Sequence, residues 1–304
     1  MKFTSIFFTA SADFRCFFPL WLLVEQVNCY RNLNNLFNWQ FGKSKVARLY
    51  YLCAVDLIEN PIMNRIPVVT KNLLAINVIM FLALLVAGKN GYDLNNLLGL
   101  HFYMSDEFHP YQLVTYMFMH GGFSHLFFNM FALFMFGRTL EYVWGPKRFL
   151  IFYVLAGIGA ALVQELIGAV RFYSLVEGID ADMLAVVFEE GAAALHEGKN
   201  FILPKLAELN LVLNSQTVGA SGAVYAILLG FGMLFPNERM YIFPIPFPIK
   251  AKFFVIGYAL IELYLGTVGS PDGVAHFAHL GGMLFGLILI LLWRKKGEIG
   301  GPYV

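Results

Sequence analysis

The sequence predicts an all-α protein that crosses a membrane several times, and two features of the chain support this prediction. Apolar residues make up 59% of its 304 residues and charged residues only 13%. Soluble domains contain about 45–50% apolar residues and about 25% charged residues. The apolar residues also gather in long blocks, and about 20 apolar residues cross a ~30 Å hydrocarbon core as a helix. A globular core would not need this excess, so we expect it to face lipid.

The composition argues against three other classes of protein. A net charge of +1 provides no extended basic surface, so we expect no nucleic-acid partner. The polar content is too low for a disordered chain. The three cysteines are Cys16, Cys29 and Cys53, and their spacing fits neither a disulfide framework nor a cysteine zinc site.

Six apolar blocks are candidate transmembrane helices, and we expect them at residues 68–88, 118–136, 148–168, 218–235, 253–269 and 274–293. Basic residues favour the cytoplasmic side of a membrane. When residue 64 is placed in the cytoplasm, eleven basic residues fall on that side: Arg65, Lys71, Arg138, Lys147, Arg148, Arg239, Lys250, Lys252, Arg294, Lys295 and Lys296. Only four fall on the other: Lys89, Arg171, Lys199 and Lys205. We therefore expect both ends of the membrane segment that starts at residue 64 to lie in the cytoplasm.

The chain shows no eukaryotic targeting feature, so we expect a multi-pass protein of the bacterial cytoplasmic (inner) membrane. The polar clusters described below lie toward the outer ends of their helices. We therefore expect the site that they form to open to the outer side.

Residues 1–62 differ from the rest of the chain, because they hold all three cysteines and an aromatic-rich stretch at 14–21. They are either a genuine N-terminal extension or translated upstream sequence before a start at Met63. We favour the second interpretation, since Asn64-Arg65 followed by an apolar helix is an ordinary cytoplasmic entry. Residues 63–304 are then one membrane domain with an outer insertion at about 171–217, where seven acidic residues outnumber three basic ones. We expect short aqueous or interfacial helices there.

Polar side chains within the apolar blocks are costly in lipid, which makes them candidates for function. The second predicted helix carries His125 and Asn129, the fourth carries Ser221, and the sixth carries His276 and His279. Small residues flank them, in Gly219-Ala-Ser221-Gly222 and at Gly282 and Gly286. Taken singly, each residue fits a structural role in helix packing or hydrogen bonding. Their common depth in the outer half of the membrane favours a single site.

Serine becomes a nucleophile when a base removes its proton, and neutral histidine is the usual base near pH 7. Gly282 and Gly286 share a helix face with His279. These small residues allow the sixth helix to approach the fourth, where Gly222 also removes bulk beside Ser221. The spacing therefore predicts that the imidazole reaches the hydroxyl.

A carbonyl attacked by serine becomes an oxyanion, which needs preorganised hydrogen-bond donors. Ser221 opens a predicted helix, so its backbone N–H has no intrahelical acceptor. His125 and Asn129 are four residues apart and share one helix face, where they can add side-chain donors. The residues thus supply a nucleophile, a base and an oxyanion hole.

Taken together and in this order, the motifs resemble those of the rhomboid intramembrane serine proteases. They are His120-xxxx-His125-xxx-Asn129, Gly219-x-Ser221-Gly222, Ala278-His279-xx-Gly282-xxx-Gly286 and, after the second helix, Gly137-Arg138-x-Leu-Glu141. The similarity covers residues 64–296. It implies a six-helix rhomboid-like bundle that hydrolyses peptide bonds in or near the transmembrane helices of single-pass substrates.

The resemblance also implies a role for each motif residue. Ser221 is the nucleophile, His279 the general base, and His125, Asn129 and the Ser221 backbone N–H form the oxyanion hole. Gly219, Gly222, Gly282 and Gly286 support the packing. We expect no cofactor and no metal.

The sequence departs from the family pattern at Tyr111-Gln112, where some members carry Trp-Arg, so the packing of this loop is left open. We expect no acid to complete a triad, because Asp272 precedes the sixth helix in a loop that water can solvate. A Ser–His dyad suffices in principle. His276 is a rival base, but it lacks the glycines at +3 and +7 that follow His279.

Two alternative functions are a metal site and a non-catalytic scaffold. A metal site would use His120, His125, His276 and His279, but the chain has no HExxH pair and no carboxylate near these residues in sequence. A non-catalytic rhomboid-like scaffold would bind transmembrane helices without cutting them. Such a scaffold typically lacks the serine or the histidine, and both are present here. The oligomeric state cannot be read from the sequence.

Overall fold

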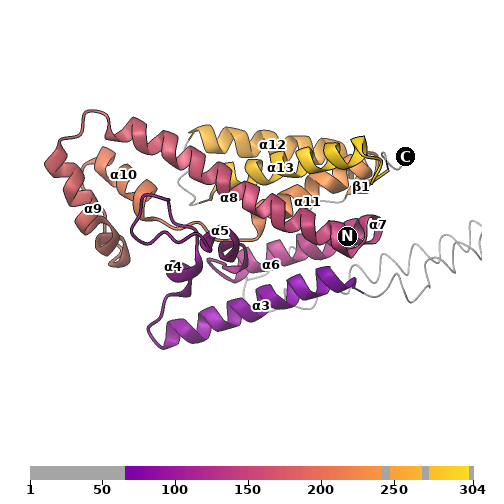
Figure 1. The fold of residues 1–304 in the computed structure, drawn as a ribbon, viewed down its shortest axis with the longest axis horizontal. Coiled ribbons are helices and arrows are strands. Elements are labelled where there is room, and N and C mark those ends of the chain that lie inside the picture. Colours follow the sequence, from indigo (N-terminus) through magenta and orange to yellow (C-terminus); the bar gives the residue numbers. More distant parts are fainter. Residues whose placement is uncertain (1–65, 241–246, 269–273, 301–304) are drawn as a thin grey trace, which may run out of the picture. The chain divides into compact units, whose positions relative to one another are not determined.

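The computed structural model of the chain describes residues 66–240, 247–268 and 274–300, and most of these residues are helical (Figure 1). The predicted extension at 1–62 and Asp272 lie outside the described residues. Four helices are long and apolar enough to cross a membrane: α3 (Val68–Lys89), α8 (Pro146–Val176), α12 (Ala251–Val268) and α13 (His276–Lys295). They match the first, third, fifth and sixth predicted spans.

The second and fourth predicted spans are also helical, but each has a feature that the pattern did not predict. The second span is α6 (Phe123–Ala132), which continues through a π-helical turn (Leu133–Gly137) into α7 (Arg138–Trp144). The fourth span is α11 (Ser221–Leu234), which has only 14 residues. A mostly helical, multi-span fold is therefore confirmed, whereas the count of six transmembrane helices stays a prediction.

Helix α11 lies at the centre of the helices that carry the candidate site, because it contacts α8, α12 and α13 (Figure 1). Its own side chains are small or apolar, and ten of its 14 residues are buried. The buried aromatic residues Phe149, Phe152 and Tyr153 of α8 pack in the same core. Between α11 and α12, the strands β1 (Arg239–Met240) and β2 (Ile249–Lys250) pair antiparallel, with Arg239 opposite Lys250.

Helix α8 is longer than the sequence suggested. The predicted span ends at residue 168, but the helix continues to Val176 and so enters the predicted insertion. The extra turns persist because Phe172 is buried in a second apolar cluster, together with Phe102, Val187, Leu206, Leu209 and Leu213. The first residues of the predicted insertion, at about 171–217, therefore continue α8.

The rest of the insertion folds as two helices, α9 (Ala181–His196) and α10 (Pro204–Asn214). The Asn210 side chain joins them by donating to the Gly191 carbonyl at 3.1 Å. Gly191 leaves room for this side chain, because a Cβ there would lie 2.2 Å from Asn210 Oδ1 and would displace it.

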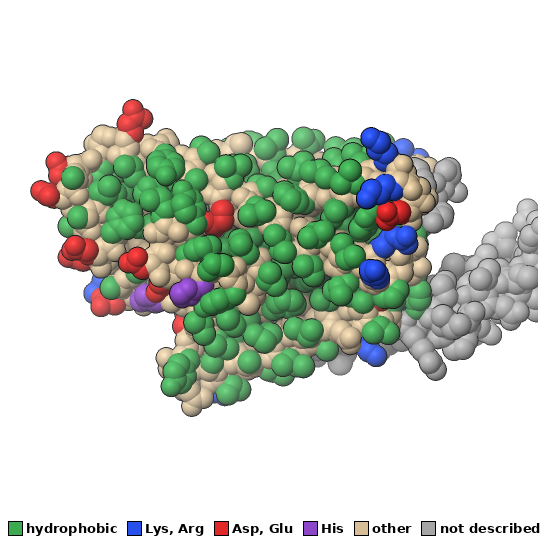
Figure 2. Space-filling view, viewed as in Figure 1, with side chains coloured by type: hydrophobic (Ala, Val, Ile, Leu, Met, Phe, Trp, Pro, Cys, Tyr) green, Lys and Arg blue, Asp and Glu red, His purple; other side chains and the backbone are tan. Residues whose placement is uncertain are grey.

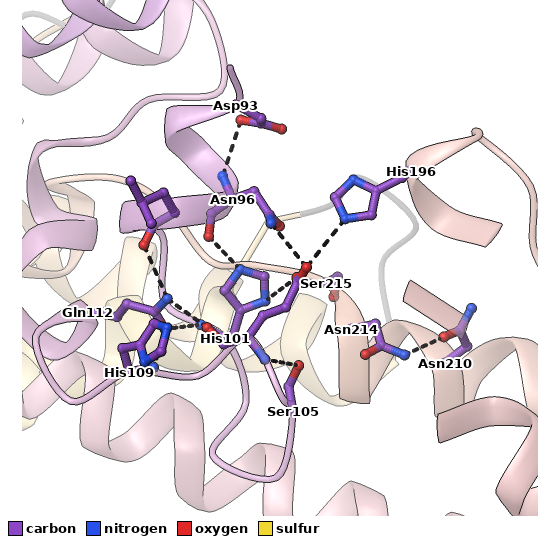
Figure 3. Close-up of polar contacts among 12 residues, drawn as sticks. Asp93, Asn96, His101, Ser105, His109, Gln112, His196, Asn210, Asn214 and Ser215 are labelled. Carbon is purple, nitrogen blue, oxygen red and sulfur yellow. Dashed lines mark hydrogen bonds and ion pairs between the residues drawn. The ribbon is translucent and has the colours of Figure 1, made fainter. Parts of the chain in front are cut away.

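The loop between α3 and α6 contains the short helices α4 (Leu94–Leu98) and α5 (Gln112–Thr115) and is organised by Gln112 (Figure 3). This fully buried side chain accepts the His101 N–H at 3.2 Å and the His109 N–H at 3.1 Å. It donates to the Leu97 and Glu107 carbonyls at 3.3 and 2.9 Å. The loop packing that the sequence left open is thus built around the glutamine itself.

Charged side chains separate along the helices, as Figure 2 shows for one face. Lysine and arginine gather where α7 and β1 lie in Figure 1, which we call the basic end. Aspartate and glutamate gather around α9 and α10, which we call the acidic end. This separation agrees with the unequal count of basic residues on the two predicted sides.

The start of α3 is held by a residue from a different helix. Pro67, which precedes α3, makes no side-chain cap. Instead the buried Glu141 of α7 accepts the Val69 N–H at 2.9 Å, the Thr70 N–H at 2.7 Å and the Thr70 hydroxyl at 2.7 Å. Backbone N–H groups at a helix start lack helical acceptors, and a carboxylate satisfies them well. Glu141 therefore fastens α7 to α3.

We expect Glu141→Ala to lower the free energy of unfolding by about 2–3 kcal/mol, because it leaves two N–H groups of α3 without an acceptor. Thermal unfolding in detergent measures the effect. Glu189→Ala, at an exposed position of α9, is the matched control, and a change within about 0.5 kcal/mol is expected for it. Equal unfolding temperatures for Glu141→Ala and the unmodified protein would contradict this capping role.

Candidate active site

Ser221 is the first residue of α11, and the glycine two residues before it has a backbone conformation that favours glycine. Gly219 has φ +130°, a value that side chains other than glycine rarely adopt. Its N–H donates to the Tyr116 carbonyl at 2.9 Å, which fixes the entry to the helix. A Cβ on Gly219 would lie 2.8 Å from His125 Nε2 and 3.5 Å from Ser221 Oγ. His125 and Ser221 therefore flank the same glycine.

The hydroxyl of Ser221 meets the imidazole of His279, although 58 positions separate the two residues in sequence. His279 Nε2 of α13 lies 2.8 Å from Ser221 Oγ. The helices approach this closely because two glycines face each other: a Cβ on Gly282 would lie 1.9 Å from the Gly222 carbonyl oxygen. One turn further along α13, a Cβ on Gly286 would lie 2.9 Å from the Ala226 Cβ.

On the other side of Ser221, α8 also comes close to α11. A Cβ on Gly222 would lie 2.4 Å from the Ala160 Cβ. The Tyr116 hydroxyl donates to the Gly157 carbonyl of α8 at 2.7 Å. Small residues on three helices thus bring the serine and its surroundings together.

A carboxylate from α12 lies behind the imidazole. Glu262 Oε2 lies 2.9 Å from His279 Nδ1 and 2.7 Å from His276 Nδ1. Its other oxygen accepts the Tyr225 hydroxyl. Glu262, His276 and His279 are only 5%, 6% and 7% exposed, respectively. Burying a carboxylate is costly unless it is hydrogen-bonded, and this one accepts three side-chain donors.

The contacts of His279 define which of its nitrogens carries the proton. A carboxylate oxygen only accepts hydrogen bonds, so Nδ1 must donate to Glu262. In the neutral imidazole Nε2 is then the acceptor, and it faces the Ser221 hydroxyl. This is the tautomer that can take a proton from serine.

Tyr225 holds the imidazole from a second direction. It lies one helical turn after Ser221, and its ring stacks on the His279 ring with centroids 4.2 Å apart and planes inclined by 7°. The same residue donates its hydroxyl to Glu262. Tyr225 therefore contacts both the ring and the carboxylate behind it.

The sequence led us to expect no acid beside His279, whereas Glu262 Oε2 lies 2.9 Å from His279 Nδ1. Asp272, the acid considered above, precedes the sixth predicted helix, whereas Glu262 lies in the fifth. A signal was available, because Glu262 is the single charged residue between 253 and 269. An ionisable residue inside an apolar span is a functional candidate by default. Tyr225 was missed because nothing in the sequence indicates which side chain stacks on His279.

The two predicted oxyanion donors differ in how they are placed. The His125 imidazole lies beside Gly219 and therefore next to Ser221. Asn129 is 5% exposed, and its amide nitrogen donates to the His125 carbonyl at 2.9 Å within α6. This bond uses one of the two amide hydrogens of Asn129 and leaves the other for an additional acceptor. The backbone N–H of Ser221 lies at the start of α11, where helical acceptors are lacking.

The four-histidine metal site does not form among the described residues. The group that could hold a metal ion consists of Glu262, His276 and His279, whose ligand atoms lie within 4.8 Å of one another. These side chains are types that bind zinc. Here the Nδ1 atoms of both histidines form hydrogen bonds with one oxygen of Glu262.

Comparison with known proteins agrees with the sequence motifs. A family model described as the Rhomboid domain matches residues 107–296. An uncharacterised mitochondrial rhomboid protein of Schizosaccharomyces pombe is 27% identical over 203 residues, which cover 60% of this chain and 52% of the relative. The chloroplastic Rhomboid-like protein 16 of Arabidopsis thaliana is 26% identical over 230 residues, which cover 75% of this chain and 62% of the relative. Rhomboid protease AarA of Providencia stuartii is 25% identical over 182 residues, which cover 58% of this chain and 53% of the relative.

These relatives also correct the expected location. The expectation of a bacterial cytoplasmic membrane, with both ends of the segment from residue 64 onward in the cytoplasm, is contradicted. The mitochondrial and chloroplastic proteins point instead to a eukaryotic organellar membrane. The absence of a recognised targeting feature was weak support, because targeting segments are defined by loose composition. The multi-pass character stands.

The match is broad in this chain but partial in the relatives. The chain spans about half the length of the curated relatives it matches. The family model nevertheless covers more than half of this chain, including the residues around Ser221, Glu262 and His279. The chain belongs to the rhomboid family.

Proposed function

We propose that the chain is an intramembrane serine endopeptidase that hydrolyses peptide bonds in or near the transmembrane helices of single-pass membrane proteins. The observation that carries the proposal is the 2.8 Å contact between Ser221 Oγ and His279 Nε2. A nucleophile within hydrogen-bond distance of a base, with the base oriented by a third group, is the arrangement of serine hydrolases. The name of the relative AarA records protease activity in the same family.

In the proposed reaction, Ser221 Oγ attacks the scissile carbonyl carbon while His279 Nε2 takes the hydroxyl proton. The carbonyl oxygen becomes an oxyanion, which is held by the Ser221 backbone N–H, the His125 imidazole and the second amide hydrogen of Asn129. His279 then gives the proton to the leaving amine nitrogen as the peptide bond breaks. A water molecule hydrolyses the remaining ester by the same sequence of proton transfers, which restores the serine.

The alternative is a rhomboid-like scaffold that binds transmembrane helices without cutting them. It is less well supported, because a scaffold needs no serine in contact with an imidazole. The two functions differ in the reactivity of Ser221, since only a base-activated hydroxyl reacts with electrophiles.

We expect a fluorophosphonate probe to label the full chain in detergent at Ser221, because His279 increases the nucleophilicity of the hydroxyl. Peptide mass spectrometry identifies the modified residue. His279→Ala should lose labelling, whereas Ser215→Ala, at an exposed position after α10, should label like the unmodified protein. An unmodified protein that stays folded and takes up no probe favours the scaffold.

A further inference from the structure

We propose that Glu262 is a positioning residue that fixes the tautomer of His279 and stabilises its charged form during the reaction. The inference deepens the proposed function and rests on it for the catalytic part. Three hydrogen bonds from two helices converge on this carboxylate: Tyr225 donates to one oxygen, and His276 and His279 donate to the other. A carboxylate offers about four lone pairs, so it can accept all three bonds.

A purely structural role explains this arrangement poorly. An isolated carboxylate in a membrane-spanning helix is expensive, and an apolar side chain would pack α12 against α13 at no such cost. The charge lies next to the nitrogen of His279 that faces away from Ser221. At that position it acts on the imidazole and not on the hydroxyl.

The carboxylate affects the imidazole in two ways. Before the reaction it accepts the Nδ1 proton, which leaves the Nε2 lone pair directed at Ser221 Oγ, 2.8 Å away. When Nε2 takes the serine proton, the imidazole becomes positive while a negative charge lies 2.9 Å from Nδ1. Opposite charges at this distance in a buried site attract strongly. The proton stays on the imidazole, and Glu262 remains ionised throughout.

Two further side chains hold the carboxylate itself. His276 lies one turn before His279 on α13 and binds the same oxygen at 2.7 Å. Tyr225 binds the second oxygen and stacks on the His279 ring. The carboxylate is therefore fixed on both oxygens, and it can direct the imidazole because it has little freedom of its own.

The first test compares Glu262→Gln with Glu262→Asp in the full chain, with cleavage of a transmembrane substrate in detergent as the readout. Glu262→Gln keeps the shape and loses the charge, and kcat should fall about 10²–10⁴-fold while KM changes little. Glu262→Asp keeps the charge and should retain more activity than Glu262→Gln. A structural role predicts the opposite order, since glutamine is the closer match in size.

Glu165→Gln is the matched control. Glu165 is an acidic residue within α8 whose carboxylate accepts the Tyr103 N–H at 2.8 Å. Its replacement should leave kcat unchanged. A Glu262→Gln variant that folds and keeps kcat within about threefold of the unmodified protein overturns the proposal.

The second test does not depend on cleavage. Nitrogen NMR of the His279 ring in the unmodified protein should show a protonated Nδ1 and an unprotonated Nε2. In Glu262→Leu, which removes the acceptor, the two nitrogens should move toward averaged values. A proton on Nε2 in the unmodified protein overturns the positioning role even where Glu262 variants do not fold. The Nδ1–H tautomer in a protein that cleaves no substrate supports the positioning role and contradicts the proposed function alone.

Discussion

Replacing Ser221 with alanine is expected to abolish cleavage of a transmembrane substrate, with kcat lowered by a factor on the order of 10⁴ or more. The variant keeps the small residue that α11 needs at its start but loses the oxygen that lies 2.8 Å from His279. His279→Ala should have a similar effect, because the hydroxyl then has no base. Residues that act as one unit are not additive, so the double variant should be no slower than either single one.

The measurement is the rate of product formation on a gel, with the variants purified in detergent. Ser215→Ala and His196→Ala are matched controls at exposed positions near the acidic end, and both should cleave at the normal rate. Thermal unfolding checks that Ser221→Ala remains folded. Cleavage by Ser221→Ala at the normal rate would show that the hydroxyl is not the nucleophile.

The second large effect is expected for Gly282→Ala, which adds a single methyl group. The new Cβ would lie 1.9 Å from the carbonyl oxygen of Gly222 and 2.6 Å from its carbonyl carbon. Both are backbone atoms, so no side chain can rotate to make room, and α13 must move away from α11. We expect a loss of about 3 kcal/mol or more in stability. Cleavage should fall with it, because Ser221 and His279 lie on the two separated helices.

Gly257→Ala provides the matched control, because a Cβ on this residue of α12 would meet no atom within 4 Å. Alanine also favours the helix, so the control should be equally or slightly more stable. Unfolding temperature and cleavage rate are measured together for the pair. A Gly282→Ala protein that unfolds at the temperature of the control would mean that α11 and α13 are not in close contact.

The sequence predicted the parts of the structure that depend on short-range pattern. Apolar blocks located α3, α12 and α13 to within a few residues, since hydropathy and length define a membrane helix. Glycine spacing predicted that the helix carrying His279 approaches the one carrying Ser221, because helices can approach closely only where side chains are small. The distances at Gly222 and Gly282 agree with that reasoning.

The parts that depend on how one helix is rotated against another were not predicted. Whether Glu262 faces lipid or His279 depends on the rotation of α12, and an apolar block carries no strong signal for it. The second apolar cluster, around Phe172, depends on contacts between distant segments and could not be predicted either. It required knowing that α9 and α10 fold back onto the end of α8. The π-helical turn at residues 133–137 likewise leaves no mark in the hydropathy pattern.

The length of α8 has a consequence for any attempt to shorten the protein. Its 31 residues extend about 46 Å at 1.5 Å per residue, which exceeds a ~30 Å hydrocarbon core. One part of this helix contacts Gly222 through Ala160, and another is buried under α9 and α10 through Phe172. Excising α9 and α10 would uncover the aromatic ring of Phe172 on α8, together with Phe102 of the loop between α4 and α5. Helices α9 and α10 therefore cover one end of the same helix that packs against the start of α11 with its Ala160.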